Sequence, residues 1–190
     1  EAVREGYTGP LYVEISPRAF SVIVRENSRL NQLRLWRGSP SAGEQELRRL
    51  HRETPLVDRA LDDQDLKKGV PVTVDLTGTD GARPIGYKAK KHTGLIDIDR
   101  VGFYEISDYW ESILDDGRHS ITLNPDDFYV LASKETVTVP PHYAAEMVPY
   151  DTLTGEFRVH YAGFFDPGFG HAESGGAGAR AVLEVRSHDV

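Results

Sequence analysis

The chain has 190 residues, with 22 lysines and arginines against 30 aspartates and glutamates, and so carries a net charge of −8 at pH 7. Its composition, 39% apolar and 27% charged, is that of a globular chain of one domain, or one and a part, and is too apolar for a disordered one. It has no apolar run long enough to span a membrane and no basic-apolar leader, so we expect a cytoplasmic protein. Because it contains no cysteine, a disulfide framework, a thiol nucleophile and a Cys-ligated zinc site are excluded.

The acidic balance argues against a surface that binds a nucleic-acid duplex, because phosphate contacts need clustered lysine and arginine side chains. Basic residues are scattered apart from one short cluster, Lys88-Ala89-Lys90-Lys91-His92. We interpret this cluster as part of a solvated loop in preference to a phosphate-binding site. Neither a nucleic acid nor a membrane is therefore expected as a partner.

The first forty residues have the period-two pattern of β-strands, in short runs that end in proline, asparagine or glycine. The strands predicted there cover 9–16, 20–27 and 30–38. Ser41 and Glu44 have the spacing of a capping box, which predicts a short helix up to His51. Residues 53–69 are polar without a clear period, and we interpret them as a connection between two units.

Strand patterns resume at residue 70 and continue to the end of the chain. A helix of one or two turns over 107–114, with Ser107 as its N-cap, interrupts them. The predicted strand regions are 70–78, 93–105, 119–141, 156–170 and 179–190. Many short strands separated by turn residues predict a mainly β fold, a barrel or a sandwich, with one or two short helices.

Two glutamates occupy similar places in two apolar strands. Glu14 lies in the run Leu-Tyr-Val-Glu-Ile and Glu184 in Ala-Val-Leu-Glu-Val, and a glycine–aromatic pair precedes each run. Strand geometry puts Tyr12 and Glu14 on one face and their apolar neighbours on the other. A carboxylate among apolar neighbours is unfavourable to bury unless it is paired or used. A solvated face would explain one such glutamate, but the repetition favours a functional role.

Residues 127–185 resemble the core of the dCTP deaminases, enzymes of the dUTPase-like superfamily, whose fold is a distorted β-barrel or jelly roll. The most specific part of the resemblance is the turn Asp166-Pro167-Gly168-Phe169, followed by the strand that carries Leu183-Glu184. Residues 6–16 resemble the same final strand, and residues 24–36 resemble the strands that close such a unit.

The resemblance implies that the chain is a piece of a double-length dCTP deaminase. Residues 1–40 are expected to hold the closing strands of a first dUTPase-like unit, and residues 41–69 to form a helical and polar connection. Residues 70–190 are then a second unit that lacks its own closing strands. Because a β-barrel does not leave long edges bare, residues 9–38 are expected to take their place.

The reaction that the resemblance implies is hydrolytic deamination of dCTP to dUTP and ammonia without zinc. Most nucleobase deaminases activate water on zinc held by histidine and cysteine, whereas the dCTP deaminases use a strand-borne glutamate as general acid and base. Glu14 and Glu184 fall on this catalytic position in their units, and our preference is Glu14 in the intact enzyme. The deoxynucleotide triphosphate is expected to arrive as a Mg²⁺ complex, which is the only metal expected.

The resemblance also implies substrate contacts. Asp166, Gly168 and Phe169 fall on the turn that frames the deoxyribose, Tyr7 on the matching aromatic position of the first unit, and His160 in the Val-His strand. Each has a structural alternative, as a turn former, a core residue or a hydrogen-bonded structural histidine. Since sites in this superfamily form between subunits, a homo-oligomer is expected.

One departure from the family concerns the grip on the phosphates, an Arg-Ser-Ser-x-x-x-Arg segment before the Val-His strand. Residues 149–154 read Pro-Tyr-Asp-Thr-Leu-Thr instead, so the second unit is expected to have lost phosphate binding. Two other functions stay open, a dUTPase-like pyrophosphatase and a non-catalytic module that binds nucleotide or assembles. A further alternative is that the isolated 190-residue chain is inactive although the longer protein is an active enzyme.

Overall fold

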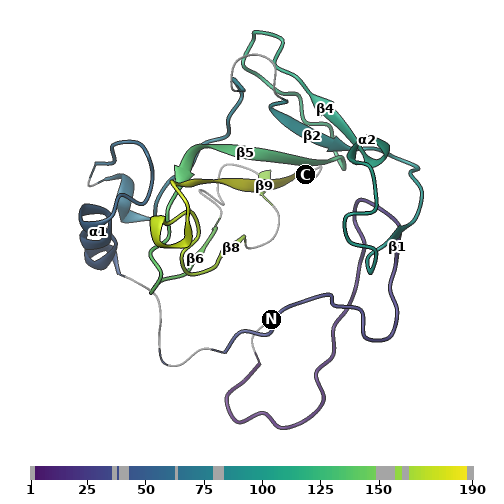
Figure 1. Ribbon diagram of the computed structural model, residues 1–190, viewed down its shortest axis with the longest axis horizontal. Coiled ribbons are helices and arrows are strands. Elements are labelled where there is room, and N and C mark those ends of the chain that lie inside the picture. Colours follow the sequence, from purple (N-terminus) through teal and green to yellow (C-terminus); the bar gives the residue numbers. More distant parts are fainter. Residues whose placement is uncertain are drawn as a thin grey trace.

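The computed structural model describes residues 3–35, 38, 43–62, 64–78, 84–148, 157–159 and 163–187; for residues 157–159 and 187 it describes the backbone alone. Its centre is a sheet of five strands with the order β4-β2-β5-β9-β7, in which all neighbours are antiparallel (Figure 1). The strands are β2 (Gly86–Ala89), β4 (Trp110–Ile113), β5 (Phe128–Val137), β7 (Phe157–Val159) and β9 (Ala179–Ser187).

Two small sheets and four short helices surround this sheet. In one, β1 (Val22–Ile23) pairs in parallel with β3 (Ile96–Asp97), and in the other β6 (Ala145–Glu146) pairs with β8 (Phe164–Phe165). The helices are α1 (Glu44–Glu53), α2 (Ile106–Tyr109) and the 3₁₀-helices η1 (Asp65–Lys67) and η2 (Ala172–Ser174). In the described part of the chain, no helix has both the length and the apolar character to cross a bilayer. The predicted mainly β fold with short helices is confirmed.

The core lies on one face of the central sheet. Alternate residues of β5 and β9 point into it, as the period of two in a strand requires. Its buried members are Tyr129, Leu131, Ala181, Leu183 and Val185. The Tyr129 hydroxyl is satisfied within this apolar layer because it accepts a hydrogen bond from the Asn124 N–H (2.9 Å). The alternation predicted over 179–190 is thereby confirmed for β9.

The N-terminal residues are mostly not in strands, contrary to prediction. In the described residues up to 35, β1 is the only strand, and residues 9–16 and 30–35 are extended without a ladder. Over 70–78 the predicted strand is reduced to a single bridge between Val74 and Ser133. The physical reason is that an apolar alternating run becomes a strand only beside a partner edge. The side chains of Leu11, Val13 and Ile15 are accordingly exposed.

Both predicted helices differ from expectation in their bounds. The first, α1, begins at Glu44, and its N-cap residue Gly43 has no side chain to cap it; Ser41, the predicted cap, lies outside the described residues. Glu44 pairs instead with Arg48, one turn along the helix. The second, α2, is a single turn over 106–109, and residues 110–113 become β4 because β2 offers them a strand partner.

The basic cluster at 88–92 is only partly the solvated loop that the sequence predicts, because residues 90–92 are exposed outside any strand whereas Lys88 and Ala89 belong to β2. Lys88 lies on β2, and its Nζ is 2.6 Å from Oδ2 of the buried Asp127. The Lys91 Nζ is 3.0 Å from the other oxygen of Asp127, and the Lys90 Nζ donates to the Ser107 carbonyl (2.7 Å). The hydrogen bond from Lys88 is the main reason that the pKa of Asp127 falls to about 2. The three lysines therefore stabilise the fold.

This lysine–aspartate group predicts a specific loss of stability in acid. The pKa of Asp127 is about 2 in the folded chain and about 3.9 in the unfolded chain, so its ionisation contributes about 2 kcal/mol above pH 4. Because the folded pKa is the lower one, this contribution is lost as the pH falls from about 4 towards 2. Urea unfolding at pH 7 and at pH 2.5 is expected to show a smaller pH effect in Asp127→Asn than in the unmodified chain. In Glu173→Gln, which changes an exposed carboxylate, the pH effect is expected to be unchanged.

Candidate active site

Glu184 lies in the middle of β9, on the face of the central sheet opposite the core. Its strand neighbours Leu183 and Val185 are buried, whereas Glu184 itself is exposed together with Val182. In the ladder Glu184 pairs with Val130 of β5, and Val130 pairs on its other side with Tyr87 of β2. Directly paired residues share a face. Tyr87, Val130 and Glu184 therefore form a row across three strands.

The environment of the Glu184 carboxyl differs from that of the other carboxyl groups whose pKa is shifted. In the part of the chain that the structure describes, no side-chain hydrogen bond or ion pair holds it. Burial of the carboxyl by surrounding protein raises its pKa above the ordinary value of a glutamate, even though the side chain keeps contact with solvent. Among the described carboxyl groups with a shifted pKa, Glu184 is the one whose pKa is raised. A carboxyl whose pKa is raised in this way is a better proton donor and acceptor for catalysis than a glutamate held in an ion pair.

Glu14 has no such environment in this structure. It lies in the extended segment 9–16, it is exposed, and no described side chain pairs with it. A shallow depression in the surface lies just beyond it in the chain, lined by residues 17–22, and includes neither Glu14 nor Glu184. The structure therefore places the two glutamates in unlike settings, one in the central sheet and one in an extended segment.

The turn from Asp166 to Phe169 lies beside the start of β9. The Asp166 carbonyl accepts the Phe169 N–H (3.1 Å), and the Phe169 carbonyl accepts the Val139 N–H (2.8 Å). The Phe169 ring packs 4.9 Å from that of Phe165, centre to centre, and Asp166 is exposed. Glu184 is five residues beyond the first residue of β9, which corresponds to ~17 Å along a strand. In this chain the turn and the Glu184 carboxyl are therefore not neighbours along β9.

Gly168 is required by the conformation of this turn. Its φ is +85°, and a Cβ at this position would overlap the hydroxyl of Ser174. We expect Gly168→Ala to lower the free energy of unfolding by about 1–2 kcal/mol, because both the left-handed backbone and the contact disfavour a side chain. Chemical denaturation measures this loss. Gly175→Ala is the matched comparison, since Gly175 also has a positive φ (+78°) but nothing lies within 4 Å of an added Cβ. A loss no larger than that of Gly175→Ala would contradict the steric part of the argument.

Of the remaining predicted contact residues, the structure describes Tyr7 and not His160. The Tyr7 hydroxyl donates to the Pro10 carbonyl (2.5 Å), so in this structure it closes a local turn of the N-terminal segment. His160 and the segment 149–154 lie outside the described residues. No three histidine, aspartate or glutamate side chains of the described ranges are arranged to hold a metal ion.

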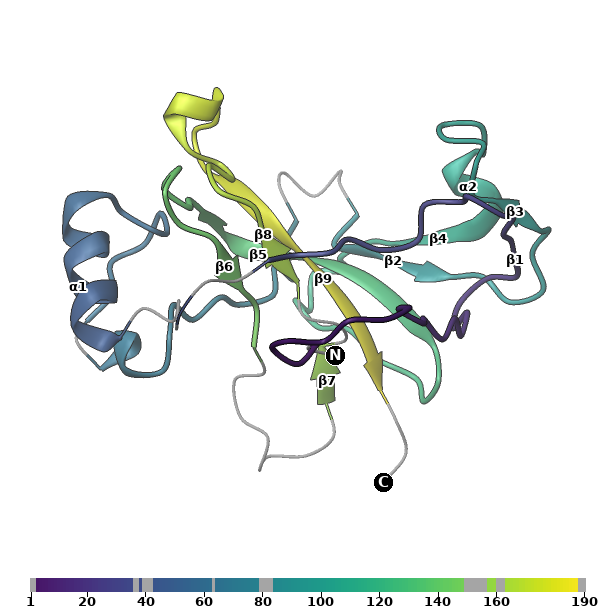
Figure 2. The same cartoon turned by 90° about the horizontal axis from the view of Figure 1, so that it is seen from below.

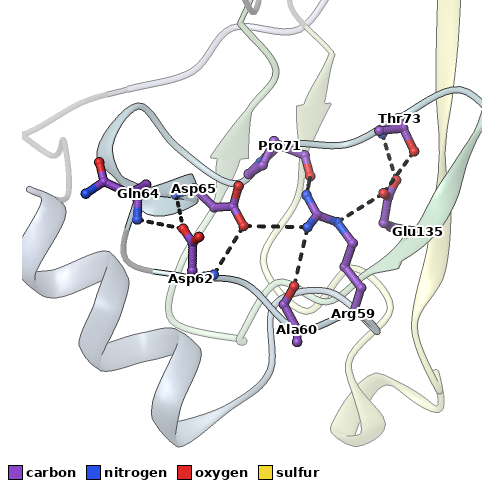
Figure 3. A network of polar contacts seen from close by, with 8 residues as sticks. All are labelled: Arg59, Ala60, Asp62, Gln64, Asp65, Pro71, Thr73 and Glu135. Carbon is purple, nitrogen blue, oxygen red and sulfur yellow. Dashed lines mark hydrogen bonds and ion pairs between the residues drawn. The ribbon is translucent and has the colours of Figure 1, made fainter.

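A third glutamate in a strand, Glu135 of β5, was not singled out in the sequence, because its neighbours Lys134 and Thr136 are polar whereas those of Glu14 and Glu184 are apolar. It is buried, and Figure 3 shows it at the end of a polar network. Its carboxylate accepts hydrogen bonds from the Thr73 N–H (2.7 Å) and hydroxyl (2.9 Å) and from Arg59 Nε (3.1 Å). Burial alone would raise the pKa of Glu135, but these hydrogen bonds outweigh it and the pKa is lowered. Glu135 is therefore a structural group whose charged form the fold stabilises, unlike Glu184.

Comparisons with known families agree with the mainly β fold. Residues 43–190 match the C-terminal domain of 2′-deoxycytidine 5′-triphosphate deaminase, and residues 1–39 match the N-terminal domain of the same family. The fold and the matched domains together define a mainly β protein of the nucleotide-deaminase class. The chain belongs to the 2′-deoxycytidine 5′-triphosphate deaminase family.

A solved structure of this family is similar to the chain. The crystal structure of 2′-deoxycytidine 5′-triphosphate deaminase from Agrobacterium tumefaciens is 49% identical in sequence, with a TM-score of 0.72. The match covers 80% of this chain and 45% of that enzyme, so the chain spans less than half of the enzyme's length. No curated protein matches the chain.

Proposed function

We propose that the protein to which this chain belongs deaminates dCTP to dUTP and ammonia, with a strand-borne glutamate as general acid and base. The observation that carries this proposal is the Glu184 carboxyl, which has no partner among the described side chains, has a raised pKa and lies in an apolar strand within the region matched to the family. The solved relative is a dCTP deaminase, which supports the same substrate class.

The chemistry that these residues support needs one proton acceptor that later becomes a donor. The ionised Glu184 carboxylate takes a proton from water, and the resulting hydroxide attacks C4 of the cytosine ring. The glutamic acid then returns its proton to the exocyclic amino group, the C4–N4 bond breaks with release of ammonia, and the proton of the new hydroxyl moves to N3 to give the uracil ring. Such proton transfer contributes about 10²–10⁴ in rate, and positioning supplies the remainder.

The preference for Glu14 drawn from the sequence is replaced here by a preference for Glu184 within this chain. Glu184 has the sheet position and the raised pKa, whereas Glu14 lies in an exposed segment without a ladder. Glu14 keeps the corresponding role in the first unit, where strands that precede this chain would pair with it. The division into 1–40, 41–69 and 70–190 remains our proposal for the two units and their connection.

Substrate contacts are assigned by the same proposal. Asp166, Gly168 and Phe169 frame the deoxyribose, His160 contributes from the strand before them, and Tyr7 serves the first unit. The substrate is a deoxynucleotide triphosphate with its own Mg²⁺, and the enzyme itself uses no zinc. The exposed apolar side chains of Val182 and of the N-terminal segment support a homo-oligomer in which subunits cover them. We place the enzyme in the cytoplasm.

The direct test is turnover by the longer protein with two substrates. Release of ammonia from dCTP, without pyrophosphate, is the expected result. Release of pyrophosphate from dUTP would instead identify the pyrophosphatase alternative, in which the carboxylate directs water at phosphorus. Nucleotide binding without release of either product would identify the non-catalytic module and overturn the proposal.

A further inference from the structure

The segment 18–28 is attached to the second half of the chain by backbone and aromatic contacts. The N–H groups of Ile96 and Ile98 donate to the carbonyls of Ser21 (3.0 Å) and Ile23 (3.5 Å), which forms the parallel ladder of β1 with β3. One residue earlier, the Phe20 ring meets two rings of the second half edge-on. Its centre is 5.6 Å from that of Tyr109 and 5.2 Å from that of Trp110.

A cluster of charged and polar side chains, called the clasp below, lies just after β1 and consists of Arg25, Ser28, Asp97 and Asp99. Arg25 binds both carboxylate oxygens of Asp97, at 2.6 and 2.9 Å, and its Nη1 is 3.3 Å from Asp99 Oδ2. The Ser28 hydroxyl donates to the same oxygen of Asp99 (2.9 Å). The acceptors are held in place in turn, because the Asp97 N–H donates to the Tyr104 hydroxyl (2.6 Å) and the Asp99 N–H to Asp97 Oδ1 (3.2 Å). A two-pronged arginine–carboxylate pair with fixed acceptors is specific in geometry as well as in charge.

Arg186 provides a separate observation at the other end of the segment. Its side chain is buried, its guanidinium lies 5.7 Å from the centre of the Phe128 ring, and Nη2 donates to the Arg18 carbonyl (2.6 Å). No carboxylate of the described residues pairs with it. A guanidinium removed from water is unfavourable unless its donors are satisfied. The buried Arg186 guanidinium therefore needs a chain segment that covers it and offers a free carbonyl group as acceptor.

We propose that these groups form one strand-binding surface on the second unit, defined by β3, Asp97, Asp99, Tyr109, Trp110 and Arg186. Its occupant is the segment 18–28 of the same chain, and it recognises a strand with an aromatic residue followed five positions later by an arginine. The N-terminal segment then continues across the sheet towards β6 and α1 (Figure 2). There Arg34 lies 3.5 Å over the ring of Phe164 in β8, so the segment is held at two places.

This surface couples the two segments that carry the candidate glutamates. Arg18 follows Glu14 by four residues, and Arg186 follows Glu184 by two, so the hydrogen bond between Arg186 and Arg18 joins the two segments directly. The strand-binding surface thus fixes the first unit's closing segment to the strand that carries the second unit's glutamate. The connection over 41–69 is not needed for this coupling.

The test is a charge exchange across the clasp, followed by hydrogen exchange in the 190-residue chain. Arg25→Asp and Asp97→Arg are each expected to raise the exchange rate of the Ile96 and Ile98 amides roughly tenfold or more, because these amides donate to the N-terminal segment. The double variant restores an opposite-charge pair and is expected to recover most of the protection. Arg29→Asp is the matched control, since Arg29 is exposed and no described group pairs with it, and its exchange should equal that of the unmodified chain.

Two results would overturn the proposal. The first is that the Ile96 and Ile98 amides of the single variants exchange at the rate of the unmodified chain, or that the double variant does not recover their protection. The second is protection that disappears on dilution together with a dimer in light scattering, which would identify a second copy as the occupant. If the charge reversals unfold the chain, Arg25→Gln serves instead, and it is expected to raise exchange at Ile96 and Ile98 while leaving the amides of β5 and β9 protected.

Discussion

Glu184→Gln is expected to lower the kcat of dCTP deamination in the full-length protein by a factor of about 10²–10⁴. Glutamine keeps the size and shape of the side chain, but it can neither take a proton from water nor return one to ammonia. The substrate contacts are left in place, so KM is expected to change little. The measurement is ammonia release over a range of dCTP concentrations, with circular dichroism to confirm that the variant is folded.

Two further variants make this experiment decisive. Glu146→Gln changes an exposed glutamate of β6 and is expected to keep the unmodified rate. Glu14→Gln reports on the first unit, whose catalytic position it occupies by resemblance. Unchanged turnover in Glu184→Gln would refute the role of Glu184, and loss in Glu14→Gln alone would move the working carboxylate to the first unit.

The pH profile gives a separate check on the same residue. Burial raises the pKa of Glu184, and the group must be ionised to accept a proton from water. The value of kcat/KM is therefore expected to rise with pH through the raised pKa, so that its acidic limb lies above the ordinary glutamate pKa of about 4.3. An acidic limb at or below that value would contradict the assignment.

The parts of the fold that follow from local pattern were accessible from the sequence. In β9 the apolar and β-branched run that holds Ala181, Leu183 and Val185 predicts the strand, and the period of two puts these three residues on one face, because it is a property of neighbouring residues. The glutamate among these residues was recognised by the same rule. The turn at 166–169 was recognised from Pro167 and Gly168, whose backbone preferences are also local.

The parts that depend on distant partners were not accessible. The partner of Lys88 and Lys91 is Asp127, which no local pattern connects to them, so the basic cluster was interpreted as solvated. Residues 110–113 have helical spacing after α2, but they form β4 because β2 lies beside them. The N-terminal alternation of Leu11 and Val13 predicts a strand, whereas the described chain offers them no edge to pair with. In each case the deciding contact is tertiary.

Glu135 illustrates both the strength and the limit of that reasoning. A glutamate within an apolar strand is unfavourable to bury unless it is paired or used, and sequence alone does not tell the two outcomes apart. In Glu135 both oxygens accept hydrogen bonds and the pKa is lowered, whereas the Glu184 carboxyl has no partner among the described side chains and its pKa is raised. The sign of the pKa shift separates the structural glutamate from the candidate catalytic one.

Glu135→Ala is therefore expected to destabilise the fold strongly without touching the chemistry. The substitution leaves the Thr73 N–H, the Thr73 hydroxyl and Arg59 Nε without their acceptor, and losing the buried partner of three such part-buried contacts costs about 3 kcal/mol. For a chain of this length the melting temperature should fall by roughly 6–12 °C. Differential scanning calorimetry measures the loss.

The loss of hydrogen bonds to the Glu135 carboxylate also determines what we expect of a control variant and how the stability should depend on pH. Glu135→Gln keeps one acceptor oxygen for Thr73 and is expected to lose less stability than the alanine variant. Because the folded pKa of Glu135 is lowered, the stability it contributes is present above the unfolded pKa of about 4.3 and is lost as the pH falls through the folded value. The difference in melting temperature between the unmodified chain and Glu135→Ala should therefore shrink in acid. A difference that stays constant between pH 7 and pH 3 would mean that the lost contacts are those of packing and not those of the ionised carboxylate.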